Sequence, residues 1–231
     1  MKKLVVLFAF LSLAGYSDAT VLTHGSVGRG HGVSLPSGDA GCNGTLSMNY
    51  DGSAENGYCW HYGGIVPPYY GAFAECYDAA GYITGIQLKL TSIGWPCLPC
   101  DLYVWLDDEG LPGSVLRSWA GYDPCPVAIW PDISTHDACV DCQRVDGPFW
   151  VGYWPGEFAN SGCGYFIAAD TNGFGGCPVT NVAPGVGYPT GWHSVSPIWG
   201  PTRAIGIGVW IGDCAVPTDE STWGQLKRLY R

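Results

Sequence analysis

The eleven cysteines are the residues of this chain with the clearest chemistry. Two close pairs, C-L-P-C at 97–100 and C-V-D-C at 139–142, resemble a four-thiolate zinc site, although the distance between the pairs is longer than in a zinc ribbon. Disulfides are the favoured alternative, because the chain begins like an exported protein and an oxidising compartment removes thiolates. An odd count leaves one thiol free or joined to another chain. The disulfide candidates are Cys42, Cys59, Cys76, Cys97, Cys100, Cys125, Cys139, Cys142, Cys163, Cys177 and Cys214.

Groups for acid–base or nucleophilic catalysis are scattered through the chain. Neither G-x-S-x-G nor H-E-x-x-H occurs, so the usual patterns of serine hydrolases and zinc proteases are missing. A glycosidase needs two carboxylates about 5 to 10 Å apart, and Glu55, Glu75, Glu109 and Glu157 could supply them only if the fold brings two together. We therefore expect no catalytic residues. The histidines, which show no ligand spacing, are His24, His31, His61, His136 and His193.

Two acidic turns offer oxygen ligands for a metal ion. Asp107 and Asp108 precede a glycine, and Asp170 and Asn172 belong to D-T-N-G. Calcium prefers such hard oxygen ligands, but neither loop matches the twelve-residue calcium-binding pattern. Asp or Asn followed by Gly is also ordinary turn chemistry. Turns are therefore the favoured interpretation, calcium is the alternative, and no other cofactor is expected.

The eleven tryptophans are the most suggestive feature for binding. An exposed set could stack on sugar rings, whereas buried rings would hold a core together. Core packing is the expected role of most of them. Trp154, Trp192 and Trp199 lie in segments rich in Pro and Gly, so these three are the candidates for exposed, ligand-binding rings. The sequence S-P-I-W-G-P around Trp199 indicates a rigid loop.

Short runs of alternating apolar and polar residues, bounded by Gly, Pro and Asp, predict the elements that must position these residues. In 82–91, the pattern predicts that Ile83, Ile86, Leu88 and Leu90 are buried and that Gln87, Lys89 and Thr91 face water. In 101–106 both faces are apolar or aromatic, as in a central strand or in a strand beneath a loop. The predicted strands are 46–50, 57–62, 71–77, 82–91, 101–106, 114–119, 127–130, 149–154, 165–169 and 205–211.

The two ends of the chain differ from this strand-rich part. Residues 1–19 have the basic start, short apolar run and small residues of a secretory signal peptide. The apolar run is too short to cross a bilayer, so no membrane span is expected in the mature chain. Residues 20–44 are predicted to be an irregular leader. Residues 215–231 are predicted to be a linker and a short amphipathic helical tail, with its basic residues in the last turns.

Composition limits the class of partner. Asp and Glu number 20 against 10 Lys and Arg, and the basic residues are dispersed, so a phosphate-binding stripe is absent and nucleic acid is not expected as a partner. The 35 glycines and 14% aromatic residues suit a sheet protein with many tight turns. We therefore expect residues 45–214 to form an all-β domain, an antiparallel two-sheet, jelly-roll-like sandwich braced by disulfides.

Several segments resemble a recurrent secreted bacterial β-sandwich module. The resemblance is carried by D-G-S-A-E-N at 51–56, V-W-L-D-D-E-G-L-P-G-S-V-L at 104–116, and the apolar runs G-P-F-W-V-G-Y-W and A-I-G-I-G-V-W-I-G-D. It covers about residues 46–213, and the many cysteines depart from the pattern. Such modules look like non-catalytic parts of extracellular multidomain proteins, so the resemblance implies the fold more strongly than a chemistry.

Two functions are consistent with these features. The first is a secreted, non-catalytic structural or interaction protein of the bacterial cell surface or extracellular space, whose partners are other extracellular or surface proteins. The second is a carbohydrate-binding module that uses exposed tryptophans to bind a polysaccharide. The first is favoured modestly, and it is motivated by the small set of candidate catalytic groups, the disulfides and the basic amphipathic tail.

Overall fold

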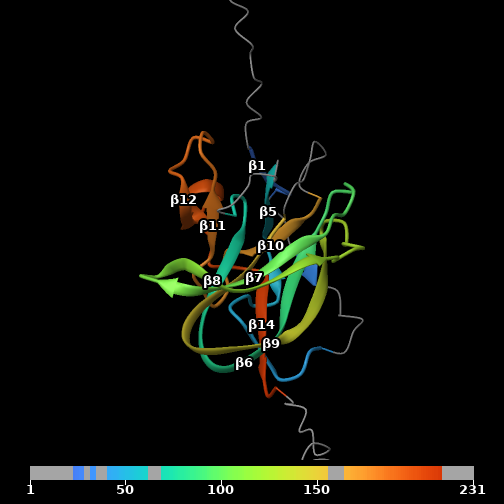
Figure 1. The fold of residues 1–231 in the computed structure, drawn as a ribbon. Coiled ribbons are helices and arrows are strands. Elements are labelled where there is room, and N and C mark those ends of the chain that lie inside the picture. Colours follow the sequence, from blue (N-terminus) through green and yellow to red (C-terminus); the bar gives the residue numbers. More distant parts are fainter. Residues whose placement is uncertain (1–22, 29–31, 35–40, 62–68, 156–163, 215–231) are drawn as a thin grey trace, which may run out of the picture.

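The computed structural model describes residues 23–28, 32–34, 41–61, 69–155 and 164–214. Its centre is a pair of long antiparallel strands, β6 (Phe73–Thr91) and β9 (Asp132–Trp154). They pair from Phe73 opposite Tyr153 to Leu90 opposite Ser134, with a register shift between Ile83 and Gly85. Figure 1 shows the two strands bending together at one end of the molecule.

The other strands join the edges of this pair. These shorter strands are β1 (Thr23–Ser26), β2 (Gly32–Ser34), β3 (Thr45–Met48), β4 (Ser53–Ala54), β5 (Asn56–His61), β7 (Cys100–Asp108), β8 (Leu111–Tyr122), β10 (Phe166–Asp170), β11 (Val179–Val182), β12 (Gly191–Ser194), β13 (Ala204–Ile205) and β14 (Ile207–Gly212).

Strand β7 pairs with β9 on one side and with β8 on the other. The other edge of β6 is shared by three strands, β11, β14 and β10, which pair with successive parts of its length. Each of these three has further partners: β12 pairs with β11, β3 pairs with β14, and both β5 and β13 pair with β10.

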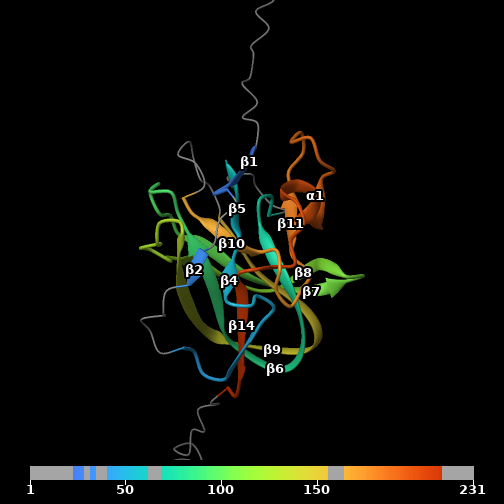
Figure 2. The same ribbon diagram turned by 180° about the vertical axis from the view of Figure 1, so that it is seen from behind.

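The predicted all-β, antiparallel, disulfide-braced class is confirmed. All strands within the described ranges are linked by hydrogen bonds into one sheet, and the pairing of β2 with β9 is the parallel exception among the named pairs. A division into two separate sheets, as in a jelly-roll sandwich, remains a prediction. Figure 2 shows β2, β4 and β14 on the side opposite to β7 and β8. The tail at 215–231 and the signal peptide at 1–19 lie outside the described residues.

The core lies within the bent sheet. Ile83, Ile86, Leu88 and Leu90 are fully buried, as the alternation in this segment predicts. Gln87 and Thr91, expected in water, are also buried, in a part of β6 that is paired on both edges, with β9 on one side and with β14 and β10 on the other. Gln87 donates from Nε2 to Asp137 (2.7 Å), and Thr91 donates from Oγ1 to the Asp132 carbonyl (2.9 Å). These bonds offset part of the loss of water, while the buried Gln87 Oε1 has no partner among the described residues.

Five parts of the chain differ from the sequence prediction. The polar stretch 132–148 is strand, continuous with the predicted 149–154, and the predicted segments 71–77 and 82–91 are one strand, β6. Residues 127–130 contribute an isolated bridge, from Ile129 to Ser92, instead of a strand. The expected loop around Trp199 contains one helical turn, α1 (Ser196–Trp199), and the leader contributes β1 and β2.

Disulfides connect segments that are distant in sequence. The bonds are Cys42–Cys139, Cys76–Cys177, Cys97–Cys125 and Cys142–Cys214, and Cys59 is also disulfide-bonded. Cys100 is free and buried, which accounts for the odd count. The four cysteines of the proposed zinc site are therefore separated into three different disulfides and a free thiol, so the zinc alternative is wrong. Within the described residues no helix is long and apolar enough to span a membrane.

Candidate functional site

The D-G-S-A-E-N segment at 51–56 forms an interlocked pair of turns with D-T-N-G at 170–173. Asp51 accepts hydrogen bonds at Oδ1 from the amide and hydroxyl of Ser53, both 2.8 Å, and donates its own amide to Asp170 Oδ2 at 3.0 Å. Such a side chain-to-backbone bond two residues along the chain is typical of Asx turns. The two segments are more than a hundred residues apart, yet they form one local structure.

Asp170 is the buried anchor of this structure. Its carboxylate accepts three backbone N–H groups, from Asp51, from Asn172 (2.9 Å) and from Gly173 (2.6 Å). Gly173 is required by close approach, because a Cβ atom there would lie 2.0 Å from Asp170 Oδ2. These donors satisfy a carboxylate that would otherwise be buried without partners.

Glu55 completes the connection from the other segment. Its Oε2 accepts hydrogen bonds from the amide (2.8 Å) and hydroxyl (3.2 Å) of Thr171, and its Oε1 accepts from Asn172 Nδ2 (2.9 Å) and lies 3.3 Å from Ser53 Oγ. The Glu55 amide in turn donates to the Ala169 carbonyl at 3.1 Å. Both oxygens of this carboxylate are therefore occupied in holding the turns, which fixes the orientation of Thr171.

A pocket of about 420 Å³ opens beside the interlocked turns. This volume is within the range of small-molecule binding sites. One wall is polar and comes from Glu55, Asn56 and Thr171, and the other is aromatic and comes from Tyr58 and Trp199. Gly200 and Pro201, after helix α1, complete the lining.

Trp199 is held in the aromatic wall by ring contacts. Its ring stacks on Tyr58, with centroids 5.0 Å apart and planes 14° apart, and meets Trp60 edge-on at 5.0 Å and Phe73 at 5.5 Å. The Trp199 side chain is half-buried. These contacts to core rings position the indole without a flexible loop, which is what a preformed aromatic platform requires.

Asn56 presents free hydrogen-bond donors at the polar wall. Its Oδ1 accepts from Ser26 Oγ (2.6 Å) and from the Gly57 amide (2.8 Å), so the orientation of the amide group is defined. Among the described residues, its Nδ2 has no hydrogen-bond partner. The pocket therefore combines a fixed amide donor and a fixed hydroxyl with an aromatic ring, a set suited to an uncharged ligand rich in hydroxyl groups.

The other two predicted binding tryptophans lie away from this pocket and are half-buried. Trp154 donates its indole N–H to the Tyr70 carbonyl at 2.9 Å and meets Tyr69 edge-on. Trp192 packs edge-on against the buried Trp105, with centroids 5.3 Å apart. The structure therefore brings only Trp199 of the three together with polar groups in a pocket.

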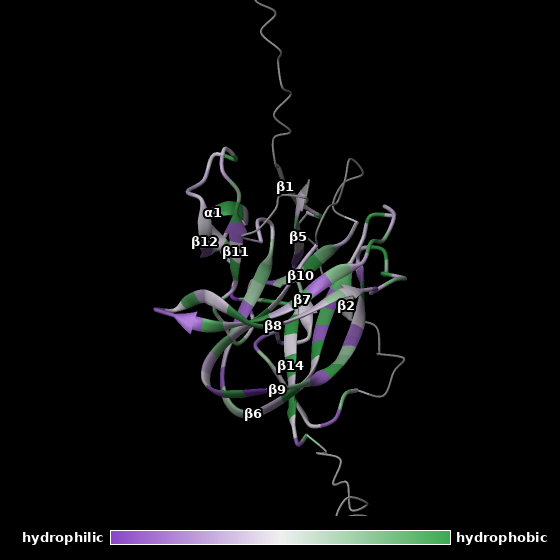
Figure 3. Ribbon diagram, viewed as in Figure 1, coloured by the Kyte–Doolittle hydropathy of each residue, from purple (hydrophilic) through white to green (hydrophobic). Residues whose placement is uncertain are grey.

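The candidate calcium ligands form two separate sets. At the β7–β8 hairpin, Asp107 accepts from Trp150 Nε1 (2.8 Å) and from the Gly110 amide (3.1 Å), while Asp108 is exposed. Figure 3 shows the hydrophilic tip of this hairpin projecting from the sheet. At the other turn, Asp170 and Asn172 make the hydrogen bonds described above. N–H donors occupy the oxygens of Asp107 and Asp170, an arrangement that favours the turn interpretation over calcium.

The histidines bring no catalytic set together in the described part of the chain. His136 accepts or donates one hydrogen bond at Nε2, to Ser134 Oγ at 2.7 Å, and burial lowers its pKa to about 4. His193 is half-buried beside the Thr190 carbonyl. Glu157 and His31 lie outside the described residues, and the structure does not describe the side chains of His24 and His61.

Comparisons with known proteins add no family to these observations. Neither family models, nor curated proteins, nor solved structures match this chain. The resemblance to a secreted bacterial sandwich module therefore remains a prediction. Sequence reasoning selected Trp199, but it missed Asn56, Tyr58 and Thr171 as site residues, since only the pairing of β5 with β10 brings those segments together.

Proposed function

We propose that this protein is a secreted, non-catalytic binding protein and that its ligand is a carbohydrate held in the pocket beside Trp199. The observation that supports carbohydrate over a purely structural role is the composition of this pocket. Its lining includes an aromatic ring, an amide group whose Nδ2 has no hydrogen-bond partner among the described residues, and an oriented hydroxyl. Sugars present both an apolar face of C–H groups, which packs on an aromatic ring, and a rim of hydroxyls, which needs fixed donors and acceptors.

The non-catalytic part of the proposal is supported by how the carboxylates are used. The carboxylate oxygens of Glu55 and Asp170 accept hydrogen bonds from N–H and O–H donors of the neighbouring turns. Neither carboxylate therefore presents a free oxygen that could accept a proton from a substrate. Secretion is supported by the disulfides, which form and persist in oxidising compartments.

The test is a glycan array followed by calorimetry with the best polysaccharide or oligosaccharide. Trp199→Ala should weaken binding about five- to thirtyfold, since loss of an aromatic stacking partner removes about 1 to 2 kcal/mol. Asn56→Asp, which keeps the acceptor for Gly57 but removes the donors of Nδ2, should also weaken binding at least tenfold. Trp192→Ala is the matched control, because this half-buried tryptophan lies outside the pocket.

Two results would overturn the proposal. The first is the absence of binding to any glycan by the folded wild-type protein. The second is binding that Asn56→Asp and Trp199→Ala leave unchanged while circular dichroism shows both variants folded. Because Trp199 also contacts core rings, Asn56→Asp provides the decisive readout if Trp199→Ala does not fold.

A further inference from the structure

A second pocket, of about 630 Å³, has a disulfide in its wall. Cys76 in β6 and Cys177 in the segment before β11 are bonded to each other and both are half-buried. Asn49, Asp107 and Trp150 belong to the same lining. A pocket of this size admits a small solute to the disulfide, a prerequisite for reaction with a thiol.

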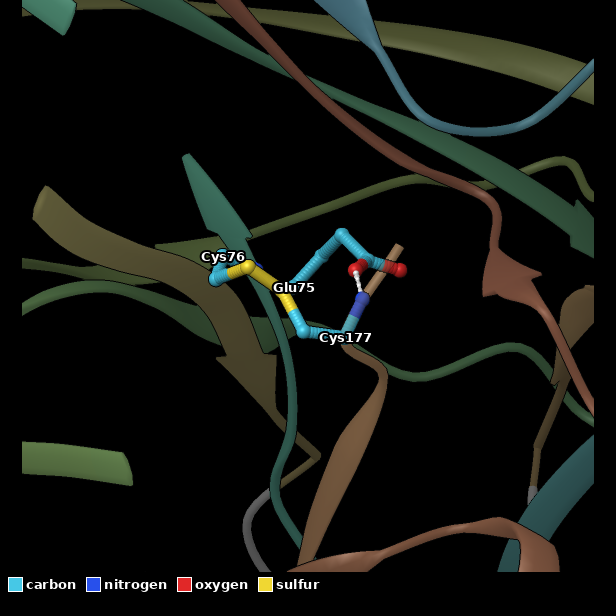
Figure 4. Close-up of side chains that lie close together, drawn as sticks. All are labelled: Glu75, Cys76 and Cys177. Carbon is cyan, nitrogen blue, oxygen red and sulfur yellow. Dashed lines mark hydrogen bonds between the residues drawn. A yellow bond between two sulfur atoms is a disulfide. The ribbon is translucent and has the colours of Figure 1, made fainter. Parts of the chain in front are cut away.

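A buried carboxyl group lies directly beside this disulfide (Figure 4). A carboxylate oxygen of Glu75 and the sulfurs of Cys76 and Cys177 all lie within 4.8 Å of one another. Glu75 Oε1 accepts the Cys177 amide at 2.6 Å and Oε2 accepts the Ile205 amide at 3.1 Å. Desolvation by burial outweighs these bonds and raises the pKa of Glu75 to about 7. The group is therefore about half protonated in neutral solution and mostly protonated in mildly acidic solution.

The two sulfurs are not equivalent. The Cys76 amide lies 3.1 Å from Cys177 Sγ and donates a hydrogen bond to it. Such a donor stabilises negative charge on Cys177 when the S–S bond breaks, and a better leaving thiolate accelerates exchange. Attack by a thiolate on Cys76 Sγ is thus the favoured direction.

We propose that the Cys76–Cys177 disulfide is a thiol-exchange site for low-molecular-weight thiols, with Glu75 as its proton donor. An external thiolate attacks Cys76 Sγ, so a mixed disulfide forms at Cys76 and the S–S bond breaks. Cys177 leaves as the thiolate and takes the proton of Glu75, which becomes a carboxylate. A second external thiolate then attacks the external sulfur of the mixed disulfide, releasing an external disulfide and the Cys76 thiolate, which takes a proton from water.

A second disulfide with a nearby carboxylate, Cys97–Cys125 beside Asp123, serves as a matched control for Cys76–Cys177 and Glu75. Asp123 accepts the Cys125 amide at 3.0 Å, and one of its oxygens lies within 4.8 Å of the sulfurs of Cys97 and Cys125, which form another disulfide. Asp123 is exposed. A hydrated carboxylate of this kind presents a negative charge to a leaving thiolate instead of a proton, and like charge disfavours the thiolate.

The experiment follows each disulfide of the folded, full-length protein during treatment with reduced glutathione, using alkylation at timed intervals and peptide mass spectrometry. Rate constants are expressed per glutathione thiolate. For Cys76–Cys177 the constant should fall about tenfold from pH 6 to pH 8, since a group with a pKa of about 7 goes from about nine-tenths to about one-tenth protonated. For Cys97–Cys125 no such fall is expected.

Glu75→Gln should abolish the pH dependence at Cys76–Cys177, and Asp123→Asn should leave it intact. A flat profile at Cys76–Cys177 in the wild-type protein would overturn the proposal, and so would a fall of equal size in Glu75→Gln. If Glu75→Gln does not fold, the wild-type comparison of the two disulfides decides alone. Glycan binding is not needed for this test, so its failure and that of the carbohydrate proposal are distinguishable.

Discussion

Glu75 should make the folded state less stable as the pH rises, the reverse of what a carboxylate with a favourable charge partner does. The perturbation that reveals this effect is Glu75→Gln, which keeps the shape of the side chain and removes its titration. Burial raises the pKa of Glu75 from 4.5 to about 7. Between these two values the unfolded chain has released this proton and the folded protein has kept it, so the free energy of unfolding falls with rising pH.

The size of the effect follows from the pKa difference. At about 1.4 kcal/mol per pKa unit, the shift corresponds to about 3 kcal/mol of unfolding free energy lost between pH 4.5 and pH 7.5. His136 acts in the opposite direction, because its lowered pKa makes the folded state lose stability as the pH falls below 6.5. The two contributions partly cancel in the wild-type protein, so the difference between variant and wild type is the quantity to measure.

The assay is urea unfolding with the disulfides intact, followed by tryptophan fluorescence at a series of pH values from 4.5 to 7.5. The unfolding free energy of Glu75→Gln, relative to wild type, should rise by about 3 kcal/mol across this range. It should do so on top of a constant loss of about 1 to 3 kcal/mol, because glutamine has one acceptor oxygen in place of two and the Ile205 amide loses its acceptor. Asp123→Asn, which removes a surface carboxylate, measures the part due to net charge. A difference between Glu75→Gln and wild type that stays constant with pH would refute the reasoning.

Two further predictions concern the core. Thr180→Val should lower the free energy of unfolding, measured by chemical denaturation, by about 2 to 3 kcal/mol. The buried Thr180 hydroxyl accepts from Trp60 Nε1 (2.7 Å) and donates to the Ala72 carbonyl (2.8 Å), and both partners would lose this hydrogen bond. An unchanged denaturation midpoint would contradict this prediction. Cys100 should resist iodoacetamide at pH 8 until the protein unfolds, because burial raises its pKa to about 12; rapid native labelling at Cys100 would show the thiol to be accessible.

The sequence predicts the fold class well wherever side chains alternate between core and solvent. Residues 82–91 and 101–106 alternate or are apolar on both faces, and they occupy strands β6 and β7. The stretch 132–148 could not be recognised, because several of its side chains face solvent and only Ile133, Ala138 and Val145 are buried hydrophobic residues there. Its strand conformation depends on pairing with β6, which is a tertiary effect.

The sequence predicts only part of the candidate site, because the contacts that form the site also depend on tertiary pairing. Trp199 stands out by its Pro- and Gly-rich surroundings, but its contacts with Tyr58 and Phe73 depend on how distant strands meet. The segments 51–56 and 170–173 each look like a separate turn. Nothing in their local pattern shows that Glu55 holds Thr171, because the hydrogen bonds form across the β5–β10 pairing.

The order of the disulfides along the chain has a consequence for fragmentation. The loop closed by Cys42 and Cys139 overlaps the loop closed by Cys76 and Cys177, and the second overlaps the loop from Cys142 to Cys214. Every peptide bond between residues 42 and 214 is thus enclosed by at least one loop. A protease that cuts this stretch once leaves two pieces that still migrate as one molecule until a reductant is added.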